Sequence, residues 1–442
     1  MKRNHTISYC GRKRFNLLKR IYNCYFTFVH SNDYTCTISI HFMKKYTFIL
    51  VLVITNLTNY SQSAYTYDDF FYYRHHLYLN TPSVLLSAAG HKASASDTAE
   101  AIRLIKQAAS KNLYDTGYIS FNDRIKFVTR TPHWNSIKKT IEKNRRALND
   151  PEKMLILTSD IDNFWKIYDE IGKPGADKLL MNNYIIKGSQ GLRTFFELRM
   201  NLRVTNIIET VKKKRTYFES IRPVTQQIYK FKPRIIEAAK KLKELYPAAI
   251  FPPTTFAIGT FGAFGTTDGG SGQLIGVEFL CDTNTVQKGE LSNWEKSVVS
   301  DTSRILGILI HELIHVEQQT SLPQTLLEKA IHEGAADFIT QLVLGYHLNS
   351  NLHVYGNAHE KELFVKFKKQ MDGEDISDWL YNGFSVKKGT PADLGYYIGY
   401  KICEAYYNKA TDKKQAIKDI LTIQDYKKFL EQSGYSNNSD EK

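Results

Sequence analysis

Apolar residues recur every three or four positions through most of the chain, which is the spacing of amphipathic helices. The first clear example begins at Asp97, after which Ala101, Leu104, Ile105 and Ala108 share one helix face. Further segments with this spacing cover 134–148, 152–171, 175–213, 217–246 and most of 301–407. The pattern therefore predicts a mostly helical body.

The helical pattern stops at Pro252-Pro253, because proline cannot continue a helix. Thr254–Gly259 and Leu274–Leu280 then favour strands, with a glycine-rich stretch between them. We expect these two strands to form a hairpin. The glycine-rich stretch lacks the Gly-Lys-Ser/Thr ending of a phosphate-binding loop and precedes a strand, which excludes that function. The predicted fold class is therefore α+β, with a small β-sheet or hairpin.

The start of the chain has the pattern of a targeting segment. Met43-Lys44-Lys45 precedes an apolar run over 46–55 and a polar end over 56–63. The run is shorter than the roughly 20 residues that span a bilayer, and the whole pattern predicts a secretory signal peptide over 43–62. We interpret Met43 as the initiator and 1–42 as a mis-called upstream extension. The alternatives are a genuine extension with a membrane anchor, and a buried apolar strand.

Export follows from this interpretation, to the periplasm or the extracellular space, with no stable transmembrane segment in the mature chain. No cysteine follows the apolar run, so the sequence does not support a lipid anchor. A mature chain would keep Cys281 and Cys403, which are too few for a disulfide framework. We expect two buried thiols, and a single bridge is the alternative.

The charge of the 442-residue chain is unevenly distributed. The formal net charge is +14, but nine basic residues and one acid give residues 1–62 a charge of +8, which leaves +6 for the rest. A large positive charge can indicate a nucleic-acid partner, but +6 on a mature chain of this length does not. We therefore expect no nucleic-acid partner.

One motif brings together the side chains of a metal site. Residues 308–317 contain His311-Glu312-Leu-Ile-His315 among apolar neighbours, which predict a buried helix. Residues four apart share a helix face, so His311 and His315 can bind one metal ion through their imidazoles. Glu312 can instead reach a water on that metal and accept its proton.

A second pair of side chains begins 18 positions after His315. Glu333 and Asp337 are four apart and share a helix face. Glu333 can complete three protein ligands and leave a fourth zinc position open, as in catalytic rather than structural sites. Asp337 can accept the spare N–H of a ligating histidine, with His311 as the first candidate. The alternative is an exposed acidic pair, but the spacing favours a Zn²⁺ site.

These motifs carry a family resemblance. His311–Gln319, Glu333–Phe338 and Asp393–Tyr400 resemble a bacterial family of predicted zinc-dependent proteases in the Glu-zincin, thermolysin-like group. That family is distantly similar to gliding-motility lipoproteins of the Bacteroidetes. The resemblance covers 250–432, is weak over 63–250 and is absent over 1–42. The Asn-Glu-x-x-Ser-Asp sequence of thermolysin itself is missing, so no substrate specificity is implied.

The resemblance implies a zincin-like metallopeptidase fold in which an edge strand beside the active-site helix binds substrate by strand addition. Thr254–Gly259 and Leu274–Leu280 are the candidates for that strand, and a buried strand is the alternative for each. The implied domain organisation is a helical accessory region over 63–250, a zincin-like catalytic domain over 251–432 and a polar tail over 433–442.

A helix near the C-terminus supplies further candidates. Pro391 predicts its start, and Gly395 and Gly399 predict close packing against the helix of His311. Tyr396 and Tyr400 share one face of this helix.

Either tyrosine could donate to the oxyanion of a tetrahedral intermediate. Tyr400 is preferred because it lies deeper in the helix, and aromatic core packing is the alternative for both. His332 is a weaker candidate for the same role.

The sequence predicts an exported zinc metallopeptidase that acts on a peptide or protein substrate, with Glu312 as general base. The alternative is a zinc-binding envelope or gliding-type scaffold protein with a zincin fold and little turnover. The sequence does not indicate an oligomeric state.

Overall fold

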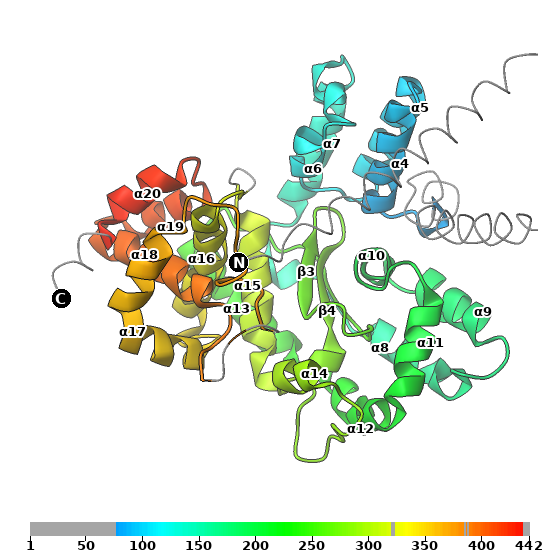
Figure 1. Ribbon diagram of the computed structural model, residues 1–442. Helices are drawn as coiled ribbons and strands as arrows, with labels where there is room; N and C mark the ends of the chain where they lie inside the picture. Colours follow the sequence, from blue (N-terminus) through cyan, green and yellow to red (C-terminus); the bar gives the residue numbers. More distant parts are fainter. Residues whose placement is uncertain (1–76, 320–322, 384–385, 387–388, 436–442) are drawn as a thin grey trace, which may run out of the picture. The chain divides into compact units, whose positions relative to one another are not determined.

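The computed structural model describes residues 77–319, 323–383, 386 and 389–435 (Figure 1). The predicted upstream extension, the signal peptide and most of the polar tail lie outside these residues. Among the residues that the structure describes, no helix combines the length and the apolar character needed to cross a membrane.

Helices make up most of the described chain, as predicted. The helices that precede Pro252-Pro253 in the chain are α4 (Pro82–Ser94), α5 (Thr98–Ser110), α6 (Gly117–Phe121), α7 (Trp134–Ala147), α8 (Ser159–Ile167), α9 (Ala176–Leu180), α10 (Gln190–Arg199), α11 (Val204–Lys213), α12 (Arg215–Thr225) and α13 (Lys232–Leu245). The helices that follow this proline pair are α14 (Asn293–Val298), α15 (Ile305–Glu317), α16 (Leu326–Leu344), α17 (Ser350–Lys368), α18 (Leu394–Lys409), α19 (Lys413–Leu421) and α20 (Tyr426–Ser433). The predicted segments 152–171, 175–213 and 217–246 are thus each divided into shorter elements.

Among the described residues, four short strands form one mixed sheet. They are β1 (Ile156–Leu157), β2 (Thr254–Ala257), β3 (Gly265–Asp268) and β4 (Gly272–Gly276), in the order β1-β2-β4-β3. β2 pairs in parallel with β1 and β4, whereas β3 and β4 are antiparallel. The α+β class is confirmed, but the zincin-like form of it stays a prediction.

The predicted hairpin between Thr254–Gly259 and Leu274–Leu280 is wrong. Both segments contain a strand, but the two strands are parallel neighbours, and the second is shorter because a 3₁₀ turn begins at Val277. The hairpin lies inside the glycine-rich stretch, between β3 and β4. Its turn is held by Asp268, whose Oδ2 accepts hydrogen bonds from the N–H groups of Gly270 (3.0 Å) and Ser271 (2.7 Å).

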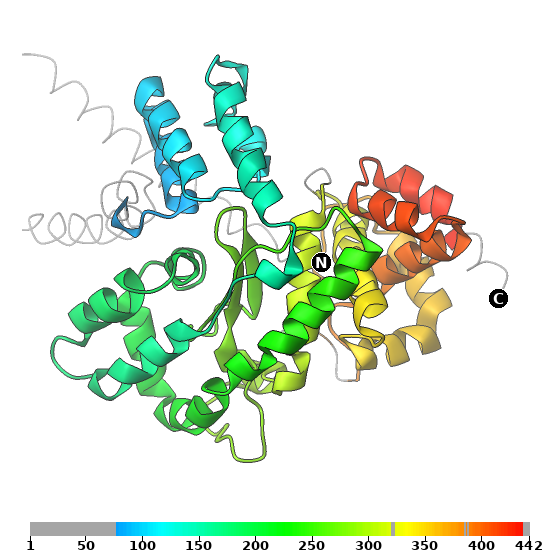
Figure 2. The same cartoon turned by 180° about the vertical axis from the view of Figure 1, so that it is seen from behind.

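The sheet lies between two sets of helices. α15 packs against β3 and β4, while α8 and α10 cover the sheet from the other side (Figure 1). Every residue of β2 and β4 is buried, as expected for strands covered on both faces. Seen from behind, α13 runs across α15 and α16, which it contacts (Figure 2). The helix that carries His311 and His315 is therefore surrounded by packed elements.

Two hydrophobic cores stabilise the described chain. The smaller core belongs to α4–α7 and is confined to residues 85–141. The main core draws on residues from 79 to 435 and includes the sheet. The predicted boundary between residues 250 and 251 therefore does not separate two cores, because β1 pairs with β2 across it. Cys281 and Cys403 are free and buried, which confirms the expectation of two thiols.

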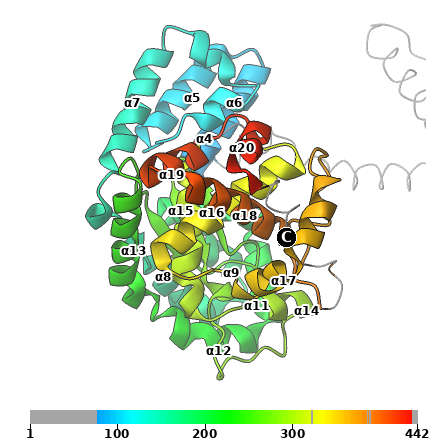
Figure 3. The same ribbon diagram turned by 90° about the vertical axis from the view of Figure 1, so that its left-hand side faces the viewer.

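Helix α18 packs most closely on α16, not on α15 as predicted (Figure 3). Gly399 faces the backbone of Ala330 there: a Cβ built on Gly399 would lie 1.7 Å from the Ala330 carbonyl oxygen. A Cβ on Gly334 would lie 2.1 Å from the amide nitrogen of Tyr400. The predicted helix start at Pro391 is also wrong, since α18 begins at Leu394 after Asp393, which has a left-handed φ of 63°.

Glu278 gives a first testable prediction. Its side chain is fully buried, and it accepts hydrogen bonds from the N–H groups of Gly259 (2.9 Å) and Phe261 (3.0 Å). Burial outweighs these bonds and raises its pKa from 4.5 to about 7. The folded state therefore binds this proton more tightly than the unfolded state does. The resulting stability is complete below pH 4.5 and is lost as the pH rises to about 7.

We expect the Glu278→Gln variant to show a flatter dependence of the free energy of unfolding on pH in this window. The difference between the two proteins should reach up to about 3 kcal/mol. Urea unfolding at several pH values measures it, and taking the difference removes groups that titrate in both proteins. Parallel curves for the two proteins would exclude Glu278 as the source.

Candidate metal centre

The two motif histidines lie on α15, a helix with buried residues around most of its circumference. His311 is buried and His315 is partly buried. Because they are one helical turn apart, their Nε2 atoms lie 3.0 Å from each other. Two imidazole nitrogens at this distance can share a proton or face one cation between them, so the pair is a candidate binding site.

Glu333 brings a carboxylate to the same point from α16. This helix begins with a capping box in which Thr325 and Glu328 bond each other's backbone N–H groups, which fixes its first turn. Two turns later, Glu333 Oε2 lies 3.3 Å from Nε2 of His311 and 3.3 Å from Nε2 of His315. Three donor atoms from two helices thus converge on one point, as the sequence predicted.

The remaining ring nitrogen of each histidine is held by a hydrogen bond. Asp337 Oδ1 lies 2.8 Å from Nδ1 of His311, which is the predicted contact. Gln318 Oε1 lies 2.7 Å from Nδ1 of His315, and its Nε2 donates to the carbonyl of His332 (2.7 Å). Both bonds favour the tautomer with the proton on Nδ1, which leaves each Nε2 free as a ligand.

The charges of the cluster depend on one another. Burial alone would lower the pKa of His311, but hydrogen bonds to Asp337 and Glu333 and their negative charges raise it well above its usual value. Burial would also lower the pKa of His315, but the negative charge of Glu333 and the hydrogen bond to it together raise this pKa. Burial would raise the pKa of Glu333, yet the two histidines lower it well below 4.5. The cluster therefore keeps an anion in the interior and favours a positive charge beside it.

The donor set fits a zinc ion. His311, His315 and Glu333 form the group of potential ligands among the described residues, with ligand atoms within 4.8 Å of one another. Donors about 2.1 Å from a tetrahedral ion are about 3.4 Å apart, which is close to the 3.3 Å separations between Glu333 and the histidines. Imidazole nitrogen with one carboxylate oxygen also suits zinc better than magnesium or calcium.

Glu312 lies between this cluster and the sheet. It is partly exposed on α15, and a Cβ on Gly265, the first residue of β3, would lie 2.9 Å from its Oε1. Glycine at this position therefore gives the carboxylate its space. β3 is also the edge strand next to α15. The two segments predicted to bind substrate contain β2 and β4, and neither of these is an edge strand. Both of those strands are interior because each has a neighbour on either side.

The two candidate tyrosines of α18 have different surroundings. The Tyr396 ring stacks on His311, with ring centroids 6.1 Å apart. Tyr400 instead packs among Phe338 and two other histidines, and its hydroxyl donates to Glu404 on its own helix (3.4 Å). The geometry therefore favours Tyr396, and the preference for Tyr400 is not supported.

His332 stacks on His315, with ring centroids 4.9 Å apart, and burial lowers its pKa to about 4. It is therefore a neutral ring at neutral pH. Its buried Nδ1 has no hydrogen-bond partner among the described residues.

Sequence reasoning missed two side chains of the centre. Gln318 follows His315 by three positions, so helical spacing could have identified it. Tyr381 could not be identified in this way, because it lies 48 positions after Glu333. Its hydroxyl donates to Glu333 Oε1 at 2.6 Å.

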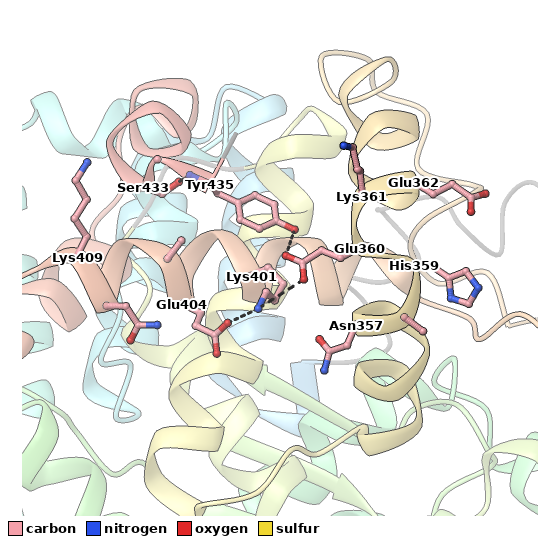
Figure 4. Close-up of a pocket in the computed structure, with 14 residues that line it drawn as sticks. Asn357, His359, Glu360, Lys361, Glu362, Lys401, Glu404, Lys409, Ser433 and Tyr435 are labelled. Atoms are coloured by element: carbon pink, nitrogen blue, oxygen red, sulfur yellow. Dashed lines mark hydrogen bonds and ion pairs between the residues drawn. The ribbon is translucent and has the colours of Figure 1, made fainter. Parts of the chain in front are cut away.

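A large cavity of about 1220 Å³ lies elsewhere, between α17, α18 and the end of α20 (Figure 4). The ionised groups at its centre bond to one another. Glu360 accepts from the hydroxyls of Tyr397 (3.2 Å) and Tyr435 (3.1 Å), and Lys401 pairs with Glu404 at 2.6 Å. These groups satisfy each other, so the chemistry of the protein is better sought at the histidine cluster.

The Asp337 contact leads to a second prediction. Asp337→Asn should weaken zinc binding by about 10–100-fold, since the amide holds the His311 ring less strongly than the carboxylate and can reverse its donor and acceptor. Competition with a chelator of known zinc affinity measures the change. An unchanged affinity would show that the contact does not orient the ligand.

The fold and the cluster define a mostly helical α+β protein with a buried centre of two histidines and one glutamate. Residues 181–437, more than half of the chain, match the family model described as gliding motility protein GldB. The chain belongs to this family, which confirms the predicted similarity to gliding-motility lipoproteins and gives the zinc-protease resemblance no support. Comparisons with curated proteins and with solved structures found no match. A lipoprotein family fits an exported protein.

Proposed function

We propose that this chain is an exported zinc-binding protein that serves as a scaffold component of a gliding-type motility machinery in the cell envelope. The family match over 181–437 is the observation that carries this proposal. The matched residues include α15, α16 and α18, and therefore all three donors of the candidate centre. In a scaffold role, zinc would join α15 to α16 in the main core.

Zinc would contribute to folding stability in that role. The donors come from two helices, so an ion bound between them favours the state in which both helices are packed. Without it, two neighbouring imidazoles and one buried carboxylate must be accommodated by protons alone. Zinc binding and the stability of the α15–α16 pair should therefore rise and fall together.

Peptide hydrolysis is the second candidate function, and the placement of Glu312 favours it. A structural zinc site usually has four protein ligands, whereas the described residues supply three. Zinc in such a site supplies Lewis acidity to a carbonyl and lowers the pKa of water. Glu312 would accept a proton beside β3, the edge strand of the sheet among the described residues, along which an extended peptide could lie. Tyr396 would be the nearer of the two predicted oxyanion donors.

One set of variants distinguishes the two functions. A gliding bacterium whose own gene for this family's protein has been deleted is complemented with the wild-type chain, His311→Ala or Glu312→Gln. Each protein is also purified and analysed for zinc. The scaffold proposal expects one zinc in the wild type, motility with Glu312→Gln, and loss of both zinc and motility with His311→Ala.

Loss of motility in a folded, zinc-loaded Glu312→Gln protein would favour hydrolysis instead. Turnover of a mixed peptide library by the wild type but not by this variant would have the same meaning. A wild-type protein that binds no zinc would overturn both candidate functions.

A further inference from the structure

We infer that Tyr381 is a positioning residue that holds Glu333 in one-oxygen coordination of the metal. This inference rests on the proposed zinc centre and adds a residue to it. The two oxygens of the Glu333 carboxylate have different partners. Oε2 faces the two histidine nitrogens at 3.3 Å each, whereas Oε1 accepts the Tyr381 hydroxyl at 2.6 Å.

The hydrogen bond determines which oxygen is available to the metal. A carboxylate can coordinate zinc through one oxygen or through both. A donor on Oε1 engages the lone pair that a second metal bond would use, and so favours coordination through Oε2 alone. With Oε2 alone as the carboxylate donor, His311, His315 and Glu333 would hold a metal ion through three protein atoms.

The backbone conformation of Tyr381 is strained, and this conformation fixes the position of its side chain. Tyr381 has a left-handed φ of 54°, a backbone conformation that is unfavourable for a residue with a Cβ. Such strain persists where the neighbouring structure imposes it, and it is concentrated at functional sites. The ring itself does not explain the conformation, because the residue is 60% exposed.

The residues on both sides of Tyr381 impose the conformation. Trp379 and Leu380 are buried, and the Trp379 carbonyl accepts from the N–H of Gly395 at 2.8 Å. On the other side, the N–H of Asp393 donates to Asn382 Oδ1 (2.9 Å) and the N–H of Asn382 donates to Asp393 Oδ1 (3.3 Å). The segment is thus attached to the start of α18 before and after the tyrosine.

The aromatic neighbours define one wall of the centre. The Tyr381 ring meets the Tyr396 ring edge to face, with centroids 6.3 Å apart, and Tyr396 stacks on His311. Tyr381 therefore contacts a ligand through its hydroxyl and, through Tyr396, borders the ring of another. An exposed residue whose hydroxyl is bonded to a metal-site carboxylate is what a positioning role requires and what simple core packing does not produce.

The test compares Tyr381→Phe with Tyr229→Phe in the full chain. Tyr229 is a matched control because it is also an exposed tyrosine, 53% accessible, and belongs to the 3₁₀ turn Ile228–Phe231 far along the chain from the centre. Zn²⁺ affinity is measured against a competing chelator. Co²⁺ is then bound in place of zinc, because its visible absorption reports the number of ligands.

We expect Tyr381→Phe to bind zinc about tenfold more weakly and to show a weaker, shifted Co²⁺ absorption, as a second carboxylate oxygen joins the metal. Tyr229→Phe should match the wild type in both measurements. Wild-type affinity and an unchanged Co²⁺ spectrum in Tyr381→Phe would overturn the inference while leaving the zinc centre intact. A wild type that binds neither ion would overturn the proposed function and this inference with it.

Discussion

Replacement of Glu333 by alanine is expected to lower zinc affinity by about 10²–10³-fold. Zinc sites contribute about 10–16 kcal/mol of binding free energy, so one of four ligand positions accounts for roughly 3–4 kcal/mol. Glu333 also supplies the negative charge that faces both histidines at 3.3 Å. Its loss leaves two neutral nitrogen donors, which hold a divalent ion much less strongly. Chelator competition and metal analysis of the purified protein measure the loss.

Glu312→Gln is the matched control for this experiment. Glu312 is also an acidic residue beside the cluster, but it faces Gly265 of β3 and is not in the ligand group. Its zinc affinity should stay near that of the wild type, so the two variants separate a ligand from a neighbouring charge. Equal zinc occupancy in Glu333→Ala and the wild type would mean that another residue is the third ligand.

The parts of the centre that the sequence predicts are those fixed by helical spacing. His311 and His315 share a face because they are four apart, and so do Glu333 and Asp337. Each pair therefore needs one helix to be correctly identified, and the residue types then indicate the metal. Tyr381 lies outside this logic. Its contact with Glu333 depends on a left-handed backbone conformation and on hydrogen bonds to the start of α18. No local sequence pattern predicts either of them.

The errors in the fold have a similar origin. The composition after Pro253 identifies the strand segments, but their parallel pairing depends on β3, a strand inside the glycine-rich stretch that takes the antiparallel place beside β4. Pro391 does not mark the start of α18, because a proline favours the first turn of a helix without requiring one. Gly399 correctly predicted a close helix contact. The partner was α16 rather than α15, since a small residue does not specify which helix approaches it.

The last prediction concerns the contact between Gly399 of α18 and the backbone of α16. We expect Gly399→Ala to lower the free energy of unfolding by about 4 kcal/mol or more. The added Cβ would lie 1.7 Å from the carbonyl oxygen of Ala330 and 2.4 Å from its carbonyl carbon. Both are backbone atoms of α16, so no side-chain rotation can relieve the overlap. The two helices must separate, and the well-packed core between them opens. Urea unfolding of the variant measures the loss.

Gly289→Ala is the control, because a Cβ at that position meets no atom within 4 Å. It should change the free energy of unfolding by less than about 0.5 kcal/mol. The same separation of helices should also weaken zinc binding, since Glu333 precedes Gly334, whose own Cβ would lie 2.1 Å from the Tyr400 nitrogen. Displacing α16 moves the carboxylate relative to the histidines of α15. A Gly399→Ala protein that unfolds at the wild-type urea concentration would show that α16 and α18 are not packed backbone to backbone.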